Sequence, residues 1–299
     1  MIINTNLPDI VHQGKVRDTY AVDDETLLMV ATDRISAFDV ILPAGIPRKG
    51  QILNRISAFW FEKTKDIVPN HFLCLADSPD LKSNFGDNPL LATLPSEIAR
   101  QAMIVKRAER IDIECIVRGY ITGQAWLEYQ RNGTVWGLSM PSGMLEGTPF
   151  PEPLFTPTNK AEEGHDVNIT QDQVEDIVGK ELAKELEVVS KQIYSFAEQH
   201  SRQRGIILAD TKLEFGLLDG KLILIDELIT PDSSRFWNAE GYSPGKSQPN
   251  YDKQFVRDYL SGQGWNQKPP APQLPKDVIE KTTQRYTEAY KLLTGESIS

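Results

Sequence analysis

The chain has 299 residues, 40% hydrophobic and 25% charged, a composition typical of a globular protein of one or two domains. A formal net charge of −10 argues against a general affinity for nucleic acid or anionic membranes. No apolar run reaches the roughly 18–20 residues that a membrane helix needs, and the N-terminus lacks a signal-peptide pattern. We therefore expect a cytoplasmic protein with small-molecule partners, whose two cysteines, Cys74 and Cys115, are reduced buried thiols. Nothing in the sequence specifies the oligomeric state, and a monomer is taken as the expectation.

The first 120 residues are rich in short apolar runs. Residues 26–33, 103–111 and 113–121 each predict a strand, and apolar spacing over 54–67 predicts a helix that ends before Pro69. No alternation of strand and helix repeats along the chain, so the sheets are expected to be antiparallel.

The middle of the chain contains a long Gly- and Pro-rich segment, 132–165, which is either a functional loop or an insertion on the surface. Thr170 is then a candidate N-cap for one helix that runs to Arg204 and is closed by Gly205. A last helix is expected through Tyr290 and Leu293.

A charged hairpin is the strongest local signal. Asp219-Gly220 predicts a turn between two apolar runs that also carry Asp210, Lys212, Glu214 and Asp226. A two-residue turn would place Glu214 and Asp226 on opposite faces, whereas a three-residue loop would gather the charges on one face. We prefer the three-residue loop. Two carboxylates and an ammonium group then suit Mg²⁺ beside phosphates, although a solvated, salt-bridged face would use the same residues.

Other polar residues gather in short motifs. Glu114 and Arg118 lie four apart in a predicted strand and share a face, so they either form a structural pair or leave the arginine to clamp an anion. Lys106 is either a phosphate contact or a lysine at the edge of the core, and His165-Asp166 is either a general-base pair or a turn.

Six segments in chain order, GKVRD, TDRISAFD, ECIVRGYITG, ADTKLEFG, IDE and TPDSSRFW, together resemble the SAICAR synthetase family of purine biosynthesis. The long Gly- and Pro-rich segment is similar to that of the longer, fungal-type members. The resemblance implies an α+β fold of two domains, 1–107 and 108–299, with mainly antiparallel sheets facing a cleft. It also implies an ATP-dependent ligase that joins L-aspartate to the carboxylate of carboxyaminoimidazole ribonucleotide, through an acyl phosphate, with Mg²⁺.

The matching motifs imply a role for each candidate residue. Catalytic residues would be Asp210 and Lys212, and magnesium ligands Glu214 and Asp226, with Glu227 as a helper. The ATP site would comprise Gly14, Lys15, Val16, Arg17, Lys106 and Glu114. The substrates would contact Arg118, Ser234, Arg235, Ser36, Asp39, Lys160 and Asp166. Gln124 stands where shorter members often have Ser or Thr, which puts a phosphate contact there in question.

Two other functions fit part of this pattern. Asp210-x-Lys212 followed by Asp226 resembles a kinase catalytic loop and its metal-binding aspartate, but His-Arg-Asp, Asp-Phe-Gly and Ala-Pro-Glu are missing. A nucleotide-binding sensor without chemistry would not need the whole charged set.

Overall fold

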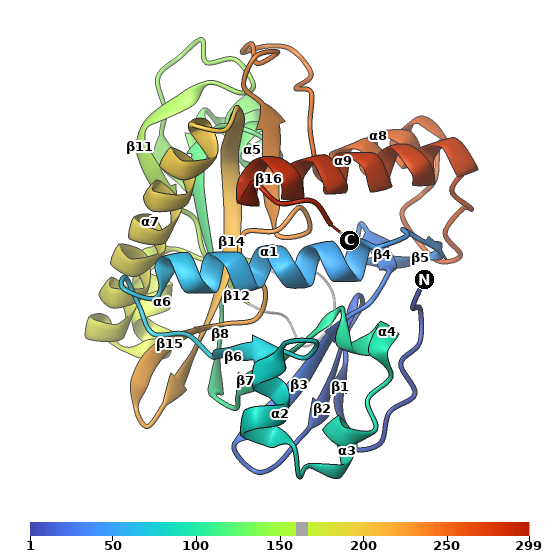
Figure 1. The fold of residues 1–299 in the computed structure, drawn as a ribbon. Coiled ribbons are helices and arrows are strands. Elements are labelled where there is room, and N and C mark those ends of the chain that lie inside the picture. The colour runs from blue at the N-terminus through green and yellow to red at the C-terminus, as the bar shows by residue number, and fades with distance from the viewer. Residues whose placement is uncertain (160–166, 299) are drawn as a thin grey trace.

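The computed structural model describes residues 1–159 and 167–298. Two large antiparallel sheets, with helices around them, form a mixed α+β fold, which confirms the predicted class (Figure 1). Among the described residues, no helix is long and apolar enough to cross a membrane.

The N-terminal sheet has the strand order β1-β2-β3-β7-β6. Short helices between β6 and β7 pack on it with a small hydrophobic core of their own. Its elements are β1 (Ile10–Gln13), β2 (Arg17–Ala21), β3 (Thr26–Ala31), β6 (Phe72–Leu75), α2 (Pro79–Phe85), α3 (Pro89–Ala92), α4 (Ser96–Ala99) and β7 (Ala102–Lys106). A separate pair of strands, β4 (Arg34–Ala37) and β5 (Val40–Gly45), follows β3.

The C-terminal sheet is built around two long neighbouring strands, β8 (Glu109–Tyr120) and β14 (Ile206–Leu218). The other strands are β11 (Pro149–Phe155), β12 (Thr158–Asn159) and β13 (Val167–Asn168) on the β8 side, and β15 (Lys221–Ile225) and β16 (Ser234–Asn238) on the β14 side. The long Gly- and Pro-rich segment extends this sheet, because it contains β11 and β12, which both pair with β8. Before β11 it forms a small hairpin, β9 (Thr134–Val135) and β10 (Leu138–Ser139), beside α5 (Gln124–Asn132).

Helices surround the C-terminal sheet. α7 (Lys180–Arg202) lies along it and buries one apolar stripe against β14 (Figure 1). The other helices are α6 (Gln171–Val178), α8 (Gln254–Gly262) and α9 (Lys276–Thr294). Thr170 caps α6 as predicted, but the single helix expected over 170–204 is wrong. Gly179, with φ +84° and ψ 155°, interrupts it and divides it into α6 and α7.

Helix α1 (Lys49–Thr64) connects the two sheets and packs on α9 (Figure 1). Its buried residues, among them Ile56 and Trp60, belong to one hydrophobic core that includes both Met29 of β3 and Phe215 of β14. The backbone joins the sheets as well, because His71 N–H donates to Leu224 O at 3.0 Å. The chain passes from one sheet to the other between β7 and β8, but with a shared core the division into domains 1–107 and 108–299 remains a prediction.

The preferred hairpin register is wrong. Leu218 pairs with Lys221 and Glu214 with Ile225, so the turn has two residues, Asp219 and Gly220. Both have positive φ, 53° and 73°, which matches a type I′ turn. This turn fits the twist of the two strands, whereas the predicted three-residue loop rested on charge segregation alone.

Candidate active site

Three polar side chains of β14 share one face of the C-terminal sheet. Asp210, Lys212 and Glu214 alternate with the apolar Leu213 and Phe215, which lie in the core on the other face. β8 runs beside β14 and pairs Arg118 with Asp210 and Glu114 with Glu214. The register of two central strands thus brings together residues from two separate motifs.

Asp210 is held by two arginines. Its Oδ2 accepts hydrogen bonds from Arg118 Nη1 at 2.8 Å and from Arg235 Nη1 at 2.6 Å. Asp210 is only 4% exposed, and so is the side chain of Arg118. Burial lowers the pKa of Arg118 to about 10, while Asp210 raises the pKa of Arg235. We name Asp210, Arg118 and Arg235 the arginine group.

Lys212 and its partners lie next along the strand. Its ammonium group forms ion pairs with Glu214 and, at 3.1 Å, with Glu114. Thr158 of β12 donates to the second oxygen of Glu114 at 3.0 Å. Burial works against the charge of Lys212, but these carboxylates outweigh it and raise its pKa well above the usual value. The alternative of a direct Glu114–Arg118 pair is wrong, because each pairs across to β14 instead.

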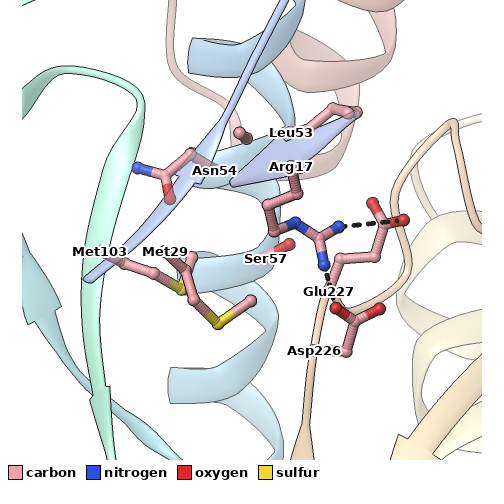
Figure 2. Close-up of a pocket in the computed structure, with 9 residues that line it drawn as sticks. Arg17, Met29, Leu53, Asn54, Ser57, Met103, Asp226 and Glu227 are labelled. Carbon is pink, nitrogen blue, oxygen red and sulfur yellow. Dashed lines mark hydrogen bonds and ion pairs between the residues drawn. The ribbon is translucent and has the colours of Figure 1, made fainter. Parts of the chain in front are cut away.

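Arg17 of β2 bridges the two sheets. Figure 2 shows its guanidinium directed at Asp226 and Glu227, which directly follow β15; it pairs with Asp226 and, at 3.2 Å, with Glu227. Burial disfavours the charge, but these two carboxylates prevail and raise the pKa of Arg17. Met29 and Leu53 line the same small space.

Asp226 reaches this side of the hairpin in spite of the two-residue turn. It follows the last residue of β15 and has φ +64°, a left-handed conformation that interrupts the alternation of an extended strand. Asp226 and Glu214 consequently line one cavity, and the charge of Glu214 helps burial to raise the pKa of Asp226. The two-residue turn therefore does not separate the carboxylates of Glu214 and Asp226.

The carboxylates outnumber the cations in this region. Glu114, Glu214, Asp226 and Glu227 face only Lys212 and Arg17 in the ion pairs above. We name these six residues the carboxylate group. Within 1–159 and 167–298, no three His, Cys, Asp or Glu side chains meet as a ready-made metal cage. The donor set nevertheless fits Mg²⁺, which takes one or two protein carboxylates and leaves its other positions to water and phosphate.

A cavity of about 490 Å³ opens between the two sheets beside this group. Leu27, Met29 and Val105 supply apolar walls from the N-terminal sheet, and Lys106 lies at its edge. Glu214, Ile225 and Asp226 line it from the C-terminal sheet.

The loop Gly14–Arg17 forms a tight turn before β2. Gly14 N–H donates to Arg17 O at 2.7 Å, and Arg34 donates to the carbonyls of Gly14 and Lys15, both at 3.1 Å. Arg34 is itself fixed by Asp18 at 2.6 Å. These contacts of Arg34 with the Gly14–Arg17 turn were not predicted, although Arg34 belongs to TDRISAFD, one of the six matching segments.

The structure also places Asp39 and Ser36, the other two candidate residues of TDRISAFD. Lys15 pairs with Asp39 at 2.5 Å on the surface, and Ser36 is half-buried in β4. Lys160 and Asp166, together with His165, lie outside the described residues.

Two polar cavities flank Arg235. The smaller, about 80 Å³, is lined by Ser234, Lys253, Arg257, Asp210 and Asp252 among others. The larger, about 290 Å³, is lined by Thr122 and Gly123, just before α5, and by Lys246 and Ser247. α5 has no side-chain cap, so its first turn can donate N–H groups to an anion. Gly123 has φ +57°, which favours glycine, and a Cβ there would meet Arg235 Nη2 at 2.5 Å and displace the guanidinium.

A buried ionic cluster around Asp232 supports the segment that presents Ser234 and Arg235. Asp232 pairs with Lys49 at 2.7 Å and with Lys253 at 3.0 Å, and Tyr286 donates to it at 2.8 Å. Burial would raise the pKa of Asp232, but the two lysines hold it well below its usual range. The cluster ties α1, α8 and α9 to the segment that presents Ser234 and Arg235. This cluster was not predicted, because Lys49 and Lys253 are 183 and 21 positions away from Asp232 along the chain.

Comparisons with known proteins identify the family. The SAICAR synthetase family model matches residues 10–272. The chain belongs to the SAICAR synthetase family. It is 50% identical over 298 residues to the phosphoribosylaminoimidazole-succinocarboxamide synthase of Thermodesulfovibrio yellowstonii, an alignment that covers 99% of each protein. The family expected from the six segments is confirmed, and family membership sets aside the kinase.

Solved structures of SAICAR synthetases share the fold. The SAICAR synthase from Saccharomyces cerevisiae, solved with SAICAR, is 41% identical over the whole of both chains, with a TM-score of 0.87. A second SAICAR synthetase, solved in complex with ADP, is 23% identical, covers 97% of this chain and all of its own, and has a TM-score of 0.70. The family is one of ATP-dependent ligases that join aspartate to the imidazole ribonucleotide in purine biosynthesis, which is the predicted activity.

Proposed function

We propose that the polar face of β14 is the catalytic centre at which this SAICAR synthetase activates a carboxylate with ATP and couples it to L-aspartate. The observation that supports this most is the position of Asp210, Lys212 and Glu214. They lie on one face, between the cavity of about 490 Å³ and the two polar cavities beside Arg235. A nucleotide and an anionic ribonucleotide can thus meet at Lys212.

ATP would occupy the cavity between the sheets. Its base would contact the apolar walls from β3 and β7 near Lys106, and its phosphates would extend toward Glu214 and Asp226. The Gly14–Arg17 turn would cover the phosphates, and Lys15 on its surface supplies a mobile cation for them. Glu114 would act through Lys212, with which it pairs.

Mg²⁺ would be held by Glu214 and Asp226, with Glu227 close by. Both ligands are now paired with cations, Glu214 with Lys212 and Asp226 with Arg17. The excess of carboxylates over cations in the carboxylate group supports the assignment. When bound, the ion would offset the negative charge of the phosphates.

The ribonucleotide would bind beside the arginine group. Its phosphate would contact Arg118, Arg235 and Ser234, and the N–H groups of the first turn of α5 can replace the hydroxyl that Gln124 lacks. Ser36, Asp39, Lys160 and Asp166 stay predictions for the substrate side. A polar environment of this kind would orient two anions with little covalent participation by the protein.

The proposed reaction has two steps. A carboxylate oxygen of the ribonucleotide attacks the γ-phosphorus of ATP, the bond to the β-phosphate oxygen breaks, and ADP leaves. The amine of aspartate then attacks the acyl carbon, loses a proton, and expels phosphate. Lys212 would stabilise the transferring phosphoryl group, and the two arginines would hold the carboxyl group of Asp210 in place beside the reacting centre.

Measuring ADP release with each substrate omitted in turn tests this proposal. We expect release only when ATP, Mg²⁺, the ribonucleotide and aspartate are all present, apart from slow turnover without aspartate. Release of ADP at full rate with a hydroxyl acceptor would contradict the proposal, and nucleotide binding without any release would indicate a sensor.

A further inference from the structure

Trp136 occupies an unusual backbone position. Val135 pairs with Leu138, so Trp136 and Gly137 form the two-residue turn of the β9–β10 hairpin, with φ +49° and +75°. Glycine and asparagine adopt this conformation easily, whereas a bulky side chain does so at a conformational cost. The contacts of the indole must therefore compensate for the cost of placing it there.

Both ends of Trp136 are firmly held. Glu128 of α5 accepts hydrogen bonds from the backbone N–H groups of Trp136 and Gly137, each at 3.0 Å. The indole N–H donates to Pro157 O, between β11 and β12, at 3.1 Å. The ring thus has a fixed position relative to both α5 and the inserted part of the sheet.

The indole lies against the guanidinium of Arg118, with the Cζ atom 4.9 Å from the ring centroid. Arg118 Nε donates to Thr156 Oγ1 at 3.0 Å, next to the proline that accepts the indole N–H. Its Nη1 donates to Asp210. The flat face of a tryptophan favours a buried guanidinium and limits its rotation. Trp136, Thr156 and Asp210 therefore surround Arg118 on three sides.

We propose that Trp136 is a positioning residue, which holds the guanidinium of Arg118 in the orientation that binds the anionic group of the ribonucleotide. The proposal rests on the substrate-binding role proposed for Arg118. It also gives the Gly- and Pro-rich segment a function in the reaction, because that segment contains the β9–β10 hairpin. The ring of Trp136 in this hairpin contacts Arg118.

Steady-state kinetics of Trp136→Ala and Trp136→Phe test the proposal. We expect Trp136→Ala to raise the KM for the ribonucleotide about tenfold, since an aromatic–guanidinium contact contributes on this scale. The KM values for ATP and aspartate should stay within about twofold. Trp136→Phe keeps an aromatic face and should restore the KM for the ribonucleotide to within about threefold of the wild-type value.

Tyr129→Ala is the matched control. Tyr129 packs in the same hydrophobic cluster and stacks on Trp126 with the ring centroids 5.6 Å apart, and none of the ring contacts found in the described residues joins it to Arg118. We expect all three KM values of this variant to stay within about twofold of wild type. An equal rise in Tyr129→Ala and Trp136→Ala would overturn the proposal, because it would reflect loosening of the whole segment.

A double mutant tests whether Trp136 acts through Arg118. In an Arg118→Gln background, Trp136→Ala should cause no further rise, and a full second rise would show that Trp136 acts elsewhere. If Arg118→Gln left the KM for the ribonucleotide unchanged, the assignment of Arg118 itself would fail. If Trp136→Ala did not fold, Trp136→Leu would replace it, and an unchanged KM in that variant would overturn the proposal.

Discussion

The arginine group and the carboxylate group lie on the same face of β14, only a few residues apart, and their charge balance is opposite. In the arginine group, Arg118 and Arg235 share one carboxylate, that of Asp210. In the carboxylate group, four acidic side chains share Lys212 and Arg17. One strand therefore presents a site suited to anions beside a site suited to cations.

The difference shows how the strand can bring two substrates together. An anionic ribonucleotide suits the arginine group, and Mg²⁺ with the phosphates of ATP suits the carboxylate group. Lys212 is the member of the carboxylate group next to Asp210 on the same face of β14. Mutations in the two groups should therefore change different kinetic parameters.

The largest effect is expected from Asp226→Asn. Loss of one carboxylate from the carboxylate group should lower kcat at least about 100-fold, because the phosphoryl group would lose the metal that offsets its charge. The free energy of unfolding should change by less than about 2 kcal/mol, since asparagine tolerates the left-handed backbone well. Turnover and urea denaturation are the measurements.

Asp219→Asn is the control for this variant. Asp219 also has a left-handed backbone, with φ 53°, but it is exposed in the hairpin turn away from the cavity. Its kcat should match that of wild type. Near-normal turnover in Asp226→Asn would remove the proposed metal site.

Arg235→Ala should affect the other group. We expect the KM for the ribonucleotide to rise about 30-fold, as for a lost charged hydrogen bond to an anion, with the KM for ATP within about threefold. Arg131→Ala, at an exposed arginine near the end of α5, should leave both values unchanged. A rise confined to ATP would show that the division into two groups is wrong.

Asp252 adds a pH dependence to the environment of Arg235. Burial raises its pKa to about 6, although the N–H groups of Phe236 and Gln254 donate to it. The unfolded chain ionises Asp252 first, so the folded state binds more protons between about pH 4 and 6 and loses stability as the pH rises through this interval.

Asp252→Asn should remove this contribution. Between pH 4 and 7 the wild type should lose about 2–3 kcal/mol relative to the variant, measured as the difference between their free energies of unfolding in urea. Parallel curves for the two proteins would mean that Asp252 titrates normally in the fold.

The smallest effect is expected from Thr158→Val. This change removes the hydrogen bond to Glu114, worth about 0.5–1.5 kcal/mol, and should raise the KM for ATP about threefold with little change in kcat. Thr283→Val removes a comparable bond within α9 and should leave the kinetics unchanged. An effect on the ribonucleotide instead would place Glu114 with the arginine group.

Much of the site could be predicted because strand periodicity is local. Lys212 and Glu214 are two residues apart in a predicted strand and were expected on one face, and the structure agrees. The hairpin register was not predicted correctly, since it depends on the backbone angles of Asp219 and Gly220. The left-handed backbone of Asp226 was also not predicted, because the apolar pattern of a strand does not indicate the φ angle of an aspartate that follows it.

Contacts between residues far apart in the sequence could not be predicted either. Lys49 and Asp232 meet only after α1 packs between the sheets, and Trp136 reaches Arg118 only after β11 has joined β8. Gly179 could have been read as a helix break, but the regular apolar stripe on both sides of it predicted continuity.

The short backbone connection between the sheets limits how the cleft can change its width. His71 N–H donates to Leu224 O at 3.0 Å, and Leu224 N–H donates to Pro69 O at 2.9 Å, two residues before Asp226. While both bonds persist, they hold the edges of the two sheets together at Leu224. The position of Asp226 relative to the N-terminal sheet is therefore restrained more closely than that of residues farther along the chain from these two bonds.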